Sequence, residues 1–531
     1  MIHSRYSLNG MVTAPHHLAA EVGANILRAG GNAVEAMVAA AATIAVVYPH
    51  MNSIGGDGFW LIAEPGRPPV GIDACGPAAN LAHIEAYREA GYDSIPARGV
   101  MAAPTVAGTV GGWAAALAMA QPWGRNLPLK VLLADAIGHA KNGVPVTVGQ
   151  SLLTRDKRHE LVDIPGFAST YLNADGTAPA PGDVLQQPDL AASLERLAEA
   201  GLDDFYRGDL ARVLSDGFEK VGGLVRRGDL EAYRPLRVAP LSVGLSCGTV
   251  YNMPPPTQGG SSLMILGLFD RLKVIEGEGF AHIHGLVEAT KRAFILRNAH
   301  VTDPAFMDVD AATWLADEFL DAESAKIDPA RALAWPHEPK QGDTVWMGSA
   351  DKQGNVVSFI QSTYWEYGSG LVLPGTGIVW QNRGMSFSLD PAHHNALAPG
   401  KRPFHTLNPA LARLIDGRTL AYGTMGGEGQ PQTQAAIFTR HAMFGMPMQQ
   451  AITAPRWLLG RTWGDDTTSL KLESRFNDDL VTALRKAGHE VEVLDDAFTG
   501  TMGHAGAISV NNRRLYEGAN DPRSDGAAVG V

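Results

Sequence analysis

A predicted β-hairpin over residues 342–360 is the feature that most constrains this 531-residue chain. Two apolar runs rich in β-branched residues flank the turn sequence at 351–355, in which Asp, Gly and Asn supply turn conformations. A polar, proline-containing segment, 335–341, precedes the hairpin, and we expect it to be exposed. Thr344 therefore lies where a loop becomes a buried strand.

This position gives Thr344 a chemical role if the chain is cut before it. A cut between Asp343 and Thr344 leaves one residue with both a hydroxyl and a free α-amine. The hydroxyl can attack a carbonyl carbon and the amine can accept its proton, which is the minimum equipment of an N-terminal-nucleophile hydrolase. An α-amine titrates near ~8, so it can act as a base at neutral pH. The alternative is that Thr344 reflects only the strand preference of β-branched residues.

Composition describes a globular protein and argues against several kinds of partner. The net charge of -12 argues against nucleic acid, because phosphates need basic residues to neutralise them. The two cysteines, Cys75 and Cys247, are too few for a metal quartet or a disulfide framework, and we expect both to be buried. We expect no metal and no cofactor. Residues 1–10 lack a signal-peptide core and 33–47 is too short to span a bilayer, so we expect a cytoplasmic protein without membrane contacts.

Hydrophobic periodicity predicts helices mainly in the first part of the chain and strands mainly in the second. The predicted helices are 17–28, 33–47, 110–119, 128–142, 187–200, 209–221, 281–297, 433–441 and 477–487. The predicted strands outside the hairpin are 11–14, 378–380, 410–415, 419–422, 469–472 and 507–510. The Gly-rich segment 51–62 fits neither a P-loop nor a dinucleotide fingerprint. Since neither part looks self-sufficient, we expect layered sheets between helices, an α+β fold.

Many collinear motifs resemble those of the γ-glutamyltranspeptidase family. They are Gly30-Gly31-Asn32-Ala33, Ile54-Gly55-Gly56-Asp57-Gly58-Phe59, Met253-Pro254-Pro255-Pro256-Thr257-Gln258-Gly259-Gly260, Thr302-Asp303-Pro304-Ala305-Phe306, Lys401-Arg402-Pro403, Gly426-Gly427 and Ala519-Asn520-Asp521-Pro522-Arg523. The resemblance implies a four-layer αββα sandwich of the N-terminal-nucleophile hydrolase type. It also implies self-cleavage into a large subunit, 1–343, and a small subunit, 344–531, which stay together as a heterodimer. Two such heterodimers could pair.

The resemblance also implies which residues carry the chemistry. Thr344 corresponds to the family's nucleophile, and Ser362 falls where the family has a hydroxyl beside it. Gly426 and Gly427 fall where backbone N–H groups form the oxyanion hole. The residues support this reading, because a strand at 419–422 turns there into a helix whose first N–H groups are unpaired. A purely structural turn is the alternative.

Several positions depart from the family pattern in the γ-glutamyl pocket. The family's Arg is missing after Asp73, and its Asn after the nucleophile matches Tyr364. Its Gln and Asp that hold the α-ammonium align near Arg383 and Ser386, and its Ser-Ser pair matches His405 and Thr406. A site without partners for a buried charge rejects that charge strongly. We therefore expect the chemistry to persist and the γ-glutamyl specificity to be lost.

Arg383 suggests what replaces that specificity. A guanidinium fork near the nucleophile suits a carboxylate, and the bulk of Tyr364 and His405 favours a small substrate. A small acid amide fits best, and the family branch that hydrolyses oxamate is the lead candidate. The alternatives are that Arg383 pairs with Asp390 as a brace and that His405 is a core histidine. The pairs His16-His17 and His393-His394 lack metal-ligand spacing, and we expect them on loops.

Three hypotheses follow from the sequence. The first is a self-processing amidohydrolase that forms an acyl-enzyme from a small acid amide. The second is a γ-glutamyltransferase, a glutathione hydrolase or a glutaryl-type acylase with a rebuilt pocket. The third is a relative without catalytic activity that binds small acids.

Overall fold

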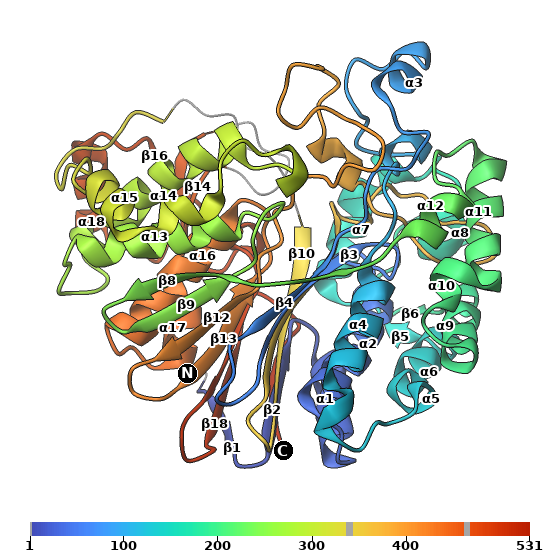
Figure 1. Ribbon diagram of the computed structural model, residues 1–531, viewed down its shortest axis with the longest axis horizontal. Helices are drawn as coiled ribbons and strands as arrows, with labels where there is room; N and C mark the ends of the chain where they lie inside the picture. Colours follow the sequence, from blue (N-terminus) through green and yellow to red (C-terminus); the bar gives the residue numbers. More distant parts are fainter. Residues whose placement is uncertain (1–2, 336–342, 461–467) are drawn as a thin grey trace.

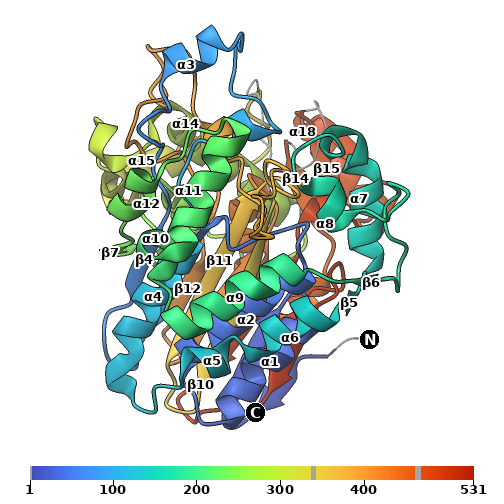
Figure 2. The ribbon, with the colours of Figure 1, turned by 90° about the vertical axis from the view of Figure 1, so that its right-hand side faces the viewer.

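The protein is a sandwich of two sheets between two helical layers (Figures 1 and 2). The computed structural model describes residues 3–335, 343–460 and 468–531. Each large sheet has seven antiparallel strands in the described chain, and helices cover the outer face of each sheet. The predicted four-layer αββα arrangement is confirmed. The polar segment expected before Thr344 lies, apart from Trp335, outside the described residues.

Both sheets combine strands from before and after Asp343. The first sheet has the order β1 (Arg5–Ser7), β18 (Tyr516–Asn520), β17 (Ala505–Val510), β13 (Thr419–Thr424), β12 (Ala410–Leu414), β9 (Gly248–Asn252) and β8 (Leu241–Leu245). The second has the order β19 (Ala527–Gly530), β2 (Gly10–Ala14), β10 (Asp343–Asp351), β11 (Val356–Tyr364), β3 (Asp57–Ala63), β4 (Val70–Ala74) and β7 (Leu236–Val238). The predicted large and small subunits therefore share both sheets.

The helices fall into two layers and a smaller group at the edges. The second sheet is covered by α1 (His17–Arg28), α2 (Ala33–Val47) and α4 (Thr109–Ala120), with α5 (Leu129–Leu132), α6 (Ala134–Asn142), α9 (Pro188–Ala200), α10 (Asp204–Arg207), α11 (Asp209–Val221) and α12 (Arg227–Ala232) outside them. The first sheet is covered by α13 (Gly259–Arg271), α14 (Phe280–His300), α15 (Asp317–Ser324), α16 (Gly429–Phe438), α17 (Met448–Thr453) and α18 (Asp478–Ala487). The other elements are α3 (Ile84–Glu89), α7 (Val148–Leu161), α8 (Phe167–Tyr171) and two small sheets, β14 (Trp457–Leu459) with β15 (Leu470–Leu472) and β16 (Val491–Val493), and β5 (Val144–Pro145) with β6 (Val184–Leu185).

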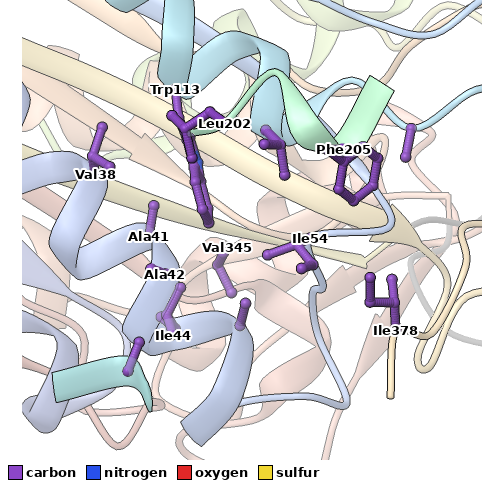
Figure 3. Close-up of a cluster of buried hydrophobic side chains, with 14 of the residues drawn as sticks. Val38, Ala41, Ala42, Ile44, Ile54, Trp113, Leu202, Phe205, Val345 and Ile378 are labelled. Carbon is purple, nitrogen blue, oxygen red and sulfur yellow. The ribbon is translucent and has the colours of Figure 1, made fainter. Parts of the chain in front are cut away.

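Helix α2 is buried on every side, as its Ala-rich, nearly all-apolar sequence predicts. Its start is fixed by a capping box: the Asn32 side chain accepts from the N–H of Glu35, and Glu35 accepts from the N–H of Asn32 at 2.8 Å. Figure 3 shows Val38, Ala41 and Ile44 facing the cluster that contains Trp113. Its small side chains let the helix lie close beneath β10 and β11, which supports the hairpin from its outer face.

On the inner face of the hairpin, Trp346 fixes β10 against the first sheet. Its indole N–H donates to the Ser358 hydroxyl at 2.9 Å. Glycines in the facing strands make room for its ring: a Cβ at Gly423 would lie 2.2 Å from Trp346 and one at Gly506 would lie 2.6 Å from it. The hairpin is therefore clamped between α2 and the first sheet, which holds its N-terminal end, and Thr344, in a fixed position.

The structure confirms most of the predicted elements and corrects several. The hairpin turn forms at 351–355, with Gly354 at φ +83°. Residues 378–380 do not form a strand; they follow the positive-φ Gly375 and Gly377 and make only isolated bridges in a buried loop. The predicted helix 128–142 is broken into α5 and α6, and the predicted helix 433–441 begins earlier, at Gly429, and ends in a π-helical turn at Thr439–Met443.

Two further expectations about single residues are corrected or refined. His16 and His17 lie at the start of α1 and not in a loop: His16 is 2% exposed and caps the helix, accepting from the N–H of Leu18, and His17 is its first residue. Cys75 is buried as predicted, but Cys247 is only half-buried. Among the described residues, no helix has both the length and the apolar character needed to cross a membrane.

Candidate active site

Thr344 lies opposite a bulge in the hairpin. Asp343 pairs with Tyr364 and Val345 pairs with Gln361, so β11 advances three residues while β10 advances two. Thr344 is thereby left out of the regular ladder, and Ser362 belongs to the extra stretch that faces it. Thr344 and Ser362 are both fully buried. A bulge re-aims side chains at functional sites, and here it frees Thr344 from regular pairing.

The Thr344 hydroxyl receives a hydrogen bond that the sequence did not reveal. Gln430, in the first turn of α16, donates from Nε2 to Thr344 Oγ1 at 3.2 Å. The same residue donates its backbone N–H to the carbonyl oxygen of Gly427 at 3.2 Å. The predicted nucleophile and the predicted oxyanion glycine are therefore linked through one residue.

Gly426 and Gly427 form a tight turn between β13 and α16. Their φ angles are +116° and +51°, a conformation that strongly favours glycine. Within the part of the chain that the structure describes, neither backbone N–H donates a hydrogen bond. Their carbonyl oxygens, in contrast, accept from the N–H groups of Gly429 and Gln430. The turn thus leaves two donors at a helix N-terminus, which is the arrangement that stabilises developing negative charge.

A buried polar network holds this turn in place. Gln258 Nε2 donates to the carbonyl oxygens of Gly427 and Thr406 at 2.8 and 2.7 Å. Its Oε1 accepts from Arg297 at 2.8 Å, and Arg297 pairs with Glu428 at 2.7 Å. The Pro-rich turn that ends at Gln258 is therefore part of the site's scaffold, since it fixes both the glycine turn and the segment at Thr406.

Arg383 is a buried cation with an open edge. It is 0% exposed, and its guanidinium carbon lies 3.8 Å from the centre of the Tyr364 ring. Nη1 donates to Thr406 Oγ1 at 3.4 Å, whereas Nε and Nη2 have no protein partner among the described residues. Burial lowers the pKa of Arg383 to about 10, opposed by the neighbouring Tyr364 and Asp57.

The structure contradicts the alternative role of Arg383 as a brace on Asp390, and it supports the alternative role of His405 as a core histidine. Asp390 accepts from the N–H of Ala392 and makes no ion pair with Arg383 in the described chain, so Arg383 is not braced by it. His405 does behave as a core histidine: its Nε2 lies 2.9 Å from Asp57 Oδ2, and burial lowers its pKa well below the usual value.

Asp57 is a buried acidic group whose charge couples to that of Arg383. Its Oδ1 accepts from the N–H groups of Gly76 and Gly108 at 3.0 Å and from Gln381 at 3.1 Å. Burial raises the pKa of Asp57 to about 7, and the charge of Arg383 opposes that rise. Burial thus moves the pKa of Asp57 toward neutrality, and the charge of Asp57 couples to a cation that has no carboxylate partner among the described residues.

Within residues 3–335, 343–460 and 468–531, two groups of side chains have the composition of a metal site. They are Asp57, Cys75 and His405, and His284, Glu288 and His489. In the second group, His284 Nδ1 lies 2.8 Å from His489 Nε2, and Glu288 accepts from Lys291 and from the N–H of Leu333. In the first, Asp57 and His405 bond each other. In both groups, candidate ligand atoms therefore already bond other protein groups.

The predicted site residues come from distant segments and meet in one chain of contacts. The contacts run in order through Thr344, Gln430, Gly427, Gln258, Thr406, Arg383, Tyr364 and Ser362, whose hydroxyl accepts from the N–H of Tyr364 at 2.8 Å. Gly426 adjoins this chain of contacts, and His405 joins it through its backbone carbonyl oxygen, which accepts from the N–H of Gln258 at 2.9 Å. The sequence reasoning missed Gln258, Asp57 and Gln430 as site residues, although Gln258 and Asp57 lie inside motifs that it singled out.

Comparison with known proteins agrees with this geometry. Residues 19–531 match the family described as gamma-glutamyltranspeptidase. The chain is 56% identical over 528 residues to the oxamate amidohydrolase proenzyme of Klebsiella pneumoniae, covering 99% of each chain. It is 42% identical over 528 residues to the glutathione hydrolase-like YwrD proenzyme of Bacillus subtilis, covering 98% of each. The crystal structure of cephalosporin acylase from Bacillus halodurans superposes with a TM-score of 0.91 at 35% identity, covering 100% of this chain and 97% of that chain. This chain therefore belongs to the γ-glutamyltranspeptidase family.

Proposed function

We propose that the chain cuts itself between Asp343 and Thr344 and then hydrolyses a small acid amide, with oxamate as the lead candidate. The observation that carries this proposal is the open edge of Arg383. Nε and Nη2 form one side of the guanidinium, the side that binds a carboxylate through two parallel hydrogen bonds. A fully buried cation with that side unoccupied is a receptor for an anion.

Oxamate matches this site because its carboxylate is bonded directly to its amide carbon. When Arg383 holds the carboxylate, the amide carbon lies one bond from the bound carboxylate carbon, within the site that contains Thr344. The positive charge of Arg383 also offsets the repulsion between the carboxylate and the negative charge that develops during attack. The 56% identity to an oxamate amidohydrolase proenzyme supports the same substrate.

In self-cleavage, the Thr344 hydroxyl attacks the carbonyl carbon of Asp343. The C–N bond breaks, the nitrogen takes the proton, and an ester joins Asp343 to Thr344 Oγ. Water then opens the ester and leaves Thr344 with a free α-amine and hydroxyl. The products are the fragments 1–343 and 344–531, which form the heterodimer.

In turnover, the α-amine of Thr344 accepts the hydroxyl proton as Oγ attacks the amide carbon. The N–H groups of Gly426 and Gly427 stabilise the oxyanion of the tetrahedral intermediate. Ammonia leaves with the transferred proton, and an oxalyl ester forms on Thr344. Water, deprotonated by the same amine, attacks the ester, so that oxalate leaves and the hydroxyl is restored.

A glutaryl-type acylase is the second candidate. The matched structure is described as a cephalosporin acylase, and a longer acyl chain could also end in a carboxylate bound by Arg383. A γ-glutamyl substrate fits less well, because its ammonium needs acceptors. Asp57, the acidic group near Arg383, already accepts from Gly76, Gly108 and Gln381 and bonds His405.

A paired assay tests the proposal. The purified chain should appear on a gel as two fragments, and the smaller should begin at Thr344. Ammonia release from oxamate should exceed 4-nitroaniline release from γ-glutamyl- and glutaryl-4-nitroanilides in catalytic efficiency. Preference for the glutaryl anilide assigns the second candidate, and preference for the γ-glutamyl anilide assigns a γ-glutamyl hydrolase or transferase. A chain that stays uncut and releases neither product is a binding protein, and the proposal is then wrong.

A further inference from the structure

We infer that Gln430 is a further catalytic residue: its amide N–H holds the Thr344 hydroxyl oxygen and stabilises that oxygen when it leaves. The inference rests on the proposed role of Thr344 as nucleophile. Its direct basis is the 3.2 Å hydrogen bond from Gln430 Nε2 to Thr344 Oγ1, between two side chains that are both 0% exposed.

The orientation of the Gln430 amide follows from its other contact. Its Oε1 accepts from the backbone N–H of Asn408 at 3.3 Å. A flipped amide would set its NH₂ group against that N–H, so two donors would face each other. Asn408 is itself held, because its carbonyl and side-chain oxygens accept from Gln434 at 2.6 Å. Gln430 therefore presents a donor, not an acceptor, to Thr344.

This donor complements the glycine turn beside it. The N–H groups of Gly426 and Gly427 are available for the carbonyl oxygen of the bond under attack. Gln430 follows in the first turn of α16 and donates its own N–H to the Gly427 carbonyl. One short segment thus offers donors to two oxygens of the tetrahedral carbon, the oxyanion and Thr344 Oγ.

A hydrogen-bond donor at Thr344 Oγ assists both the attack on the amide and the later deacylation. During attack, a donor aimed at the oxygen directs the hydroxyl's own proton elsewhere, toward the base that must take it. During deacylation, the bond between Oγ and the acyl carbon breaks and its electron pair returns to Oγ, which then regains a proton. The Gln430 N–H stabilises the negative charge on Oγ until that proton arrives. Hydrolysis of the ester in self-cleavage also returns an electron pair to Oγ and needs the same stabilisation.

Gln430→Glu is the sharpest test. It keeps the side-chain length and an oxygen for the N–H of Asn408, but it replaces the donor with a second oxygen. We expect self-cleavage and turnover to slow on the order of 10²-fold near pH 8, as for loss of a preorganised donor. A protonated glutamic acid can donate again, and burial raises the pKa of a carboxyl. The deficit relative to the parent should therefore shrink as pH falls.

Two further variants keep the test decisive. Gln432→Glu also buries a carboxylate in α16, but Gln432 bonds the backbone of Glu428 and Leu459, not Thr344. It should process and turn over near the parental rate wherever it is folded. Gln430→Met removes the donor without a buried charge, and it should be slow at every pH. Gln430→Met also tests the role of the donor if Gln430→Glu fails to fold.

Self-cleavage after cell-free synthesis, followed by intact mass, separates the two possible failures. If the parent does not cut before Thr344, the proposed function is wrong. If the parent cuts there but folded Gln430→Glu or Gln430→Met cuts and turns over at the parental rate, the inference about Gln430 is wrong. A deficit in Gln430→Glu that is constant with pH and matched by Gln432→Glu also overturns it.

Discussion

The guanidinium of Arg383 is stacked on the ring of Tyr364, 3.8 Å from its centre, with no carboxylate bonded to it in the described chain. A desolvated cation–π contact is worth about 2 kcal/mol. Removing a cation from water costs several kcal/mol, more than this contact returns. The stack therefore positions the cation without neutralising it, and the proposed substrate carboxylate would complete the balance.

The first prediction concerns the cut itself. Thr344→Ala should remain one full-length chain and be inactive, because it lacks the attacking oxygen. Thr344→Ser keeps a hydroxyl and should still be cut, more slowly. N-terminal sequencing of the small fragment checks the position. A fragment that begins at any other residue would remove Thr344 from its assigned role.

The second prediction concerns Arg383. Removing one partner of a buried charge pair costs about 2–5 kcal/mol, so Arg383→Ala should lose between roughly 30-fold and several thousand-fold in kcat/KM on oxamate. Oxamide, the neutral analogue, should be affected far less. Arg383→Lys keeps the charge but not the fork, and its kcat/KM on oxamate should lie between those of the parent and Arg383→Ala.

Self-cleavage serves as the folding control for these Arg383 variants, since it needs Thr344 and not the substrate carboxylate. The decisive quantity is the ratio of oxamate to oxamide hydrolysis. An unchanged ratio in Arg383→Ala would mean that Arg383 does not bind the substrate carboxylate.

The third prediction concerns the pH dependence of substrate binding. The pKa of Asp57 is raised to about 7, so Asp57 becomes charged as pH rises through neutrality. Its negative charge competes with the substrate carboxylate for the field of Arg383, and KM for oxamate should rise above about pH 7. Asp57→Asn keeps an oxygen for Gly76 and Gly108 but cannot ionise, so its KM should stay low and flat. Identical pH profiles of KM in both proteins would contradict this role.

The fourth prediction concerns stability in acid. Burial lowers the pKa of His16 and His489 to about 3 and that of His504 to about 4. The unfolded chain binds protons at these residues near pH 6.5, whereas the folded chain does not, so stability is full above that pH and falls below it. Each group contributes up to about 1.4 kcal/mol per pH unit over that window. Asp57, whose pKa is raised, acts in the opposite direction between its unfolded value and about 7.

Urea unfolding of uncut Thr344→Ala at pH 7.5, 6 and 5 measures this loss. The free energy of unfolding should fall as the pH falls, and more steeply at the lower pH values. Adding His504→Gln should make this dependence on pH shallower. A slope that His504→Gln leaves unchanged would show that His504 is not buried as a neutral group.

The sequence predicted those features that depend on neighbouring residues. The hairpin turn at 351–355, the helix at 33–47 and the glycine turn before α16 each carry a local signature, and the structure contains all of them. The segment 378–380 shows the limit, because an apolar run in a buried loop has the composition of a strand.

The site was harder to predict because its contacts join distant residues. Gln430 lies 86 positions from Thr344, and Gln258 lies 169 positions from Gly427. Nothing in the spacing of a single sequence marks a glutamine in a helix as the neighbour of a threonine in a strand. Arg383 was found through the resemblance, but its open edge appears only once Tyr364, Thr406 and Asp57 surround it.

The sharing of both sheets between residues before and after Asp343 has a consequence for reassembly. In the uncut precursor, β2 and β10 belong to one molecule, and refolding is independent of concentration. After the cut, the same strand pair joins two molecules, and recovery from denaturation becomes a bimolecular reaction. Dilution should then slow renaturation of the mature protein but not of its precursor. The mature enzyme would depend for its lifetime on slow unfolding more than on recovery, which is kinetic stability.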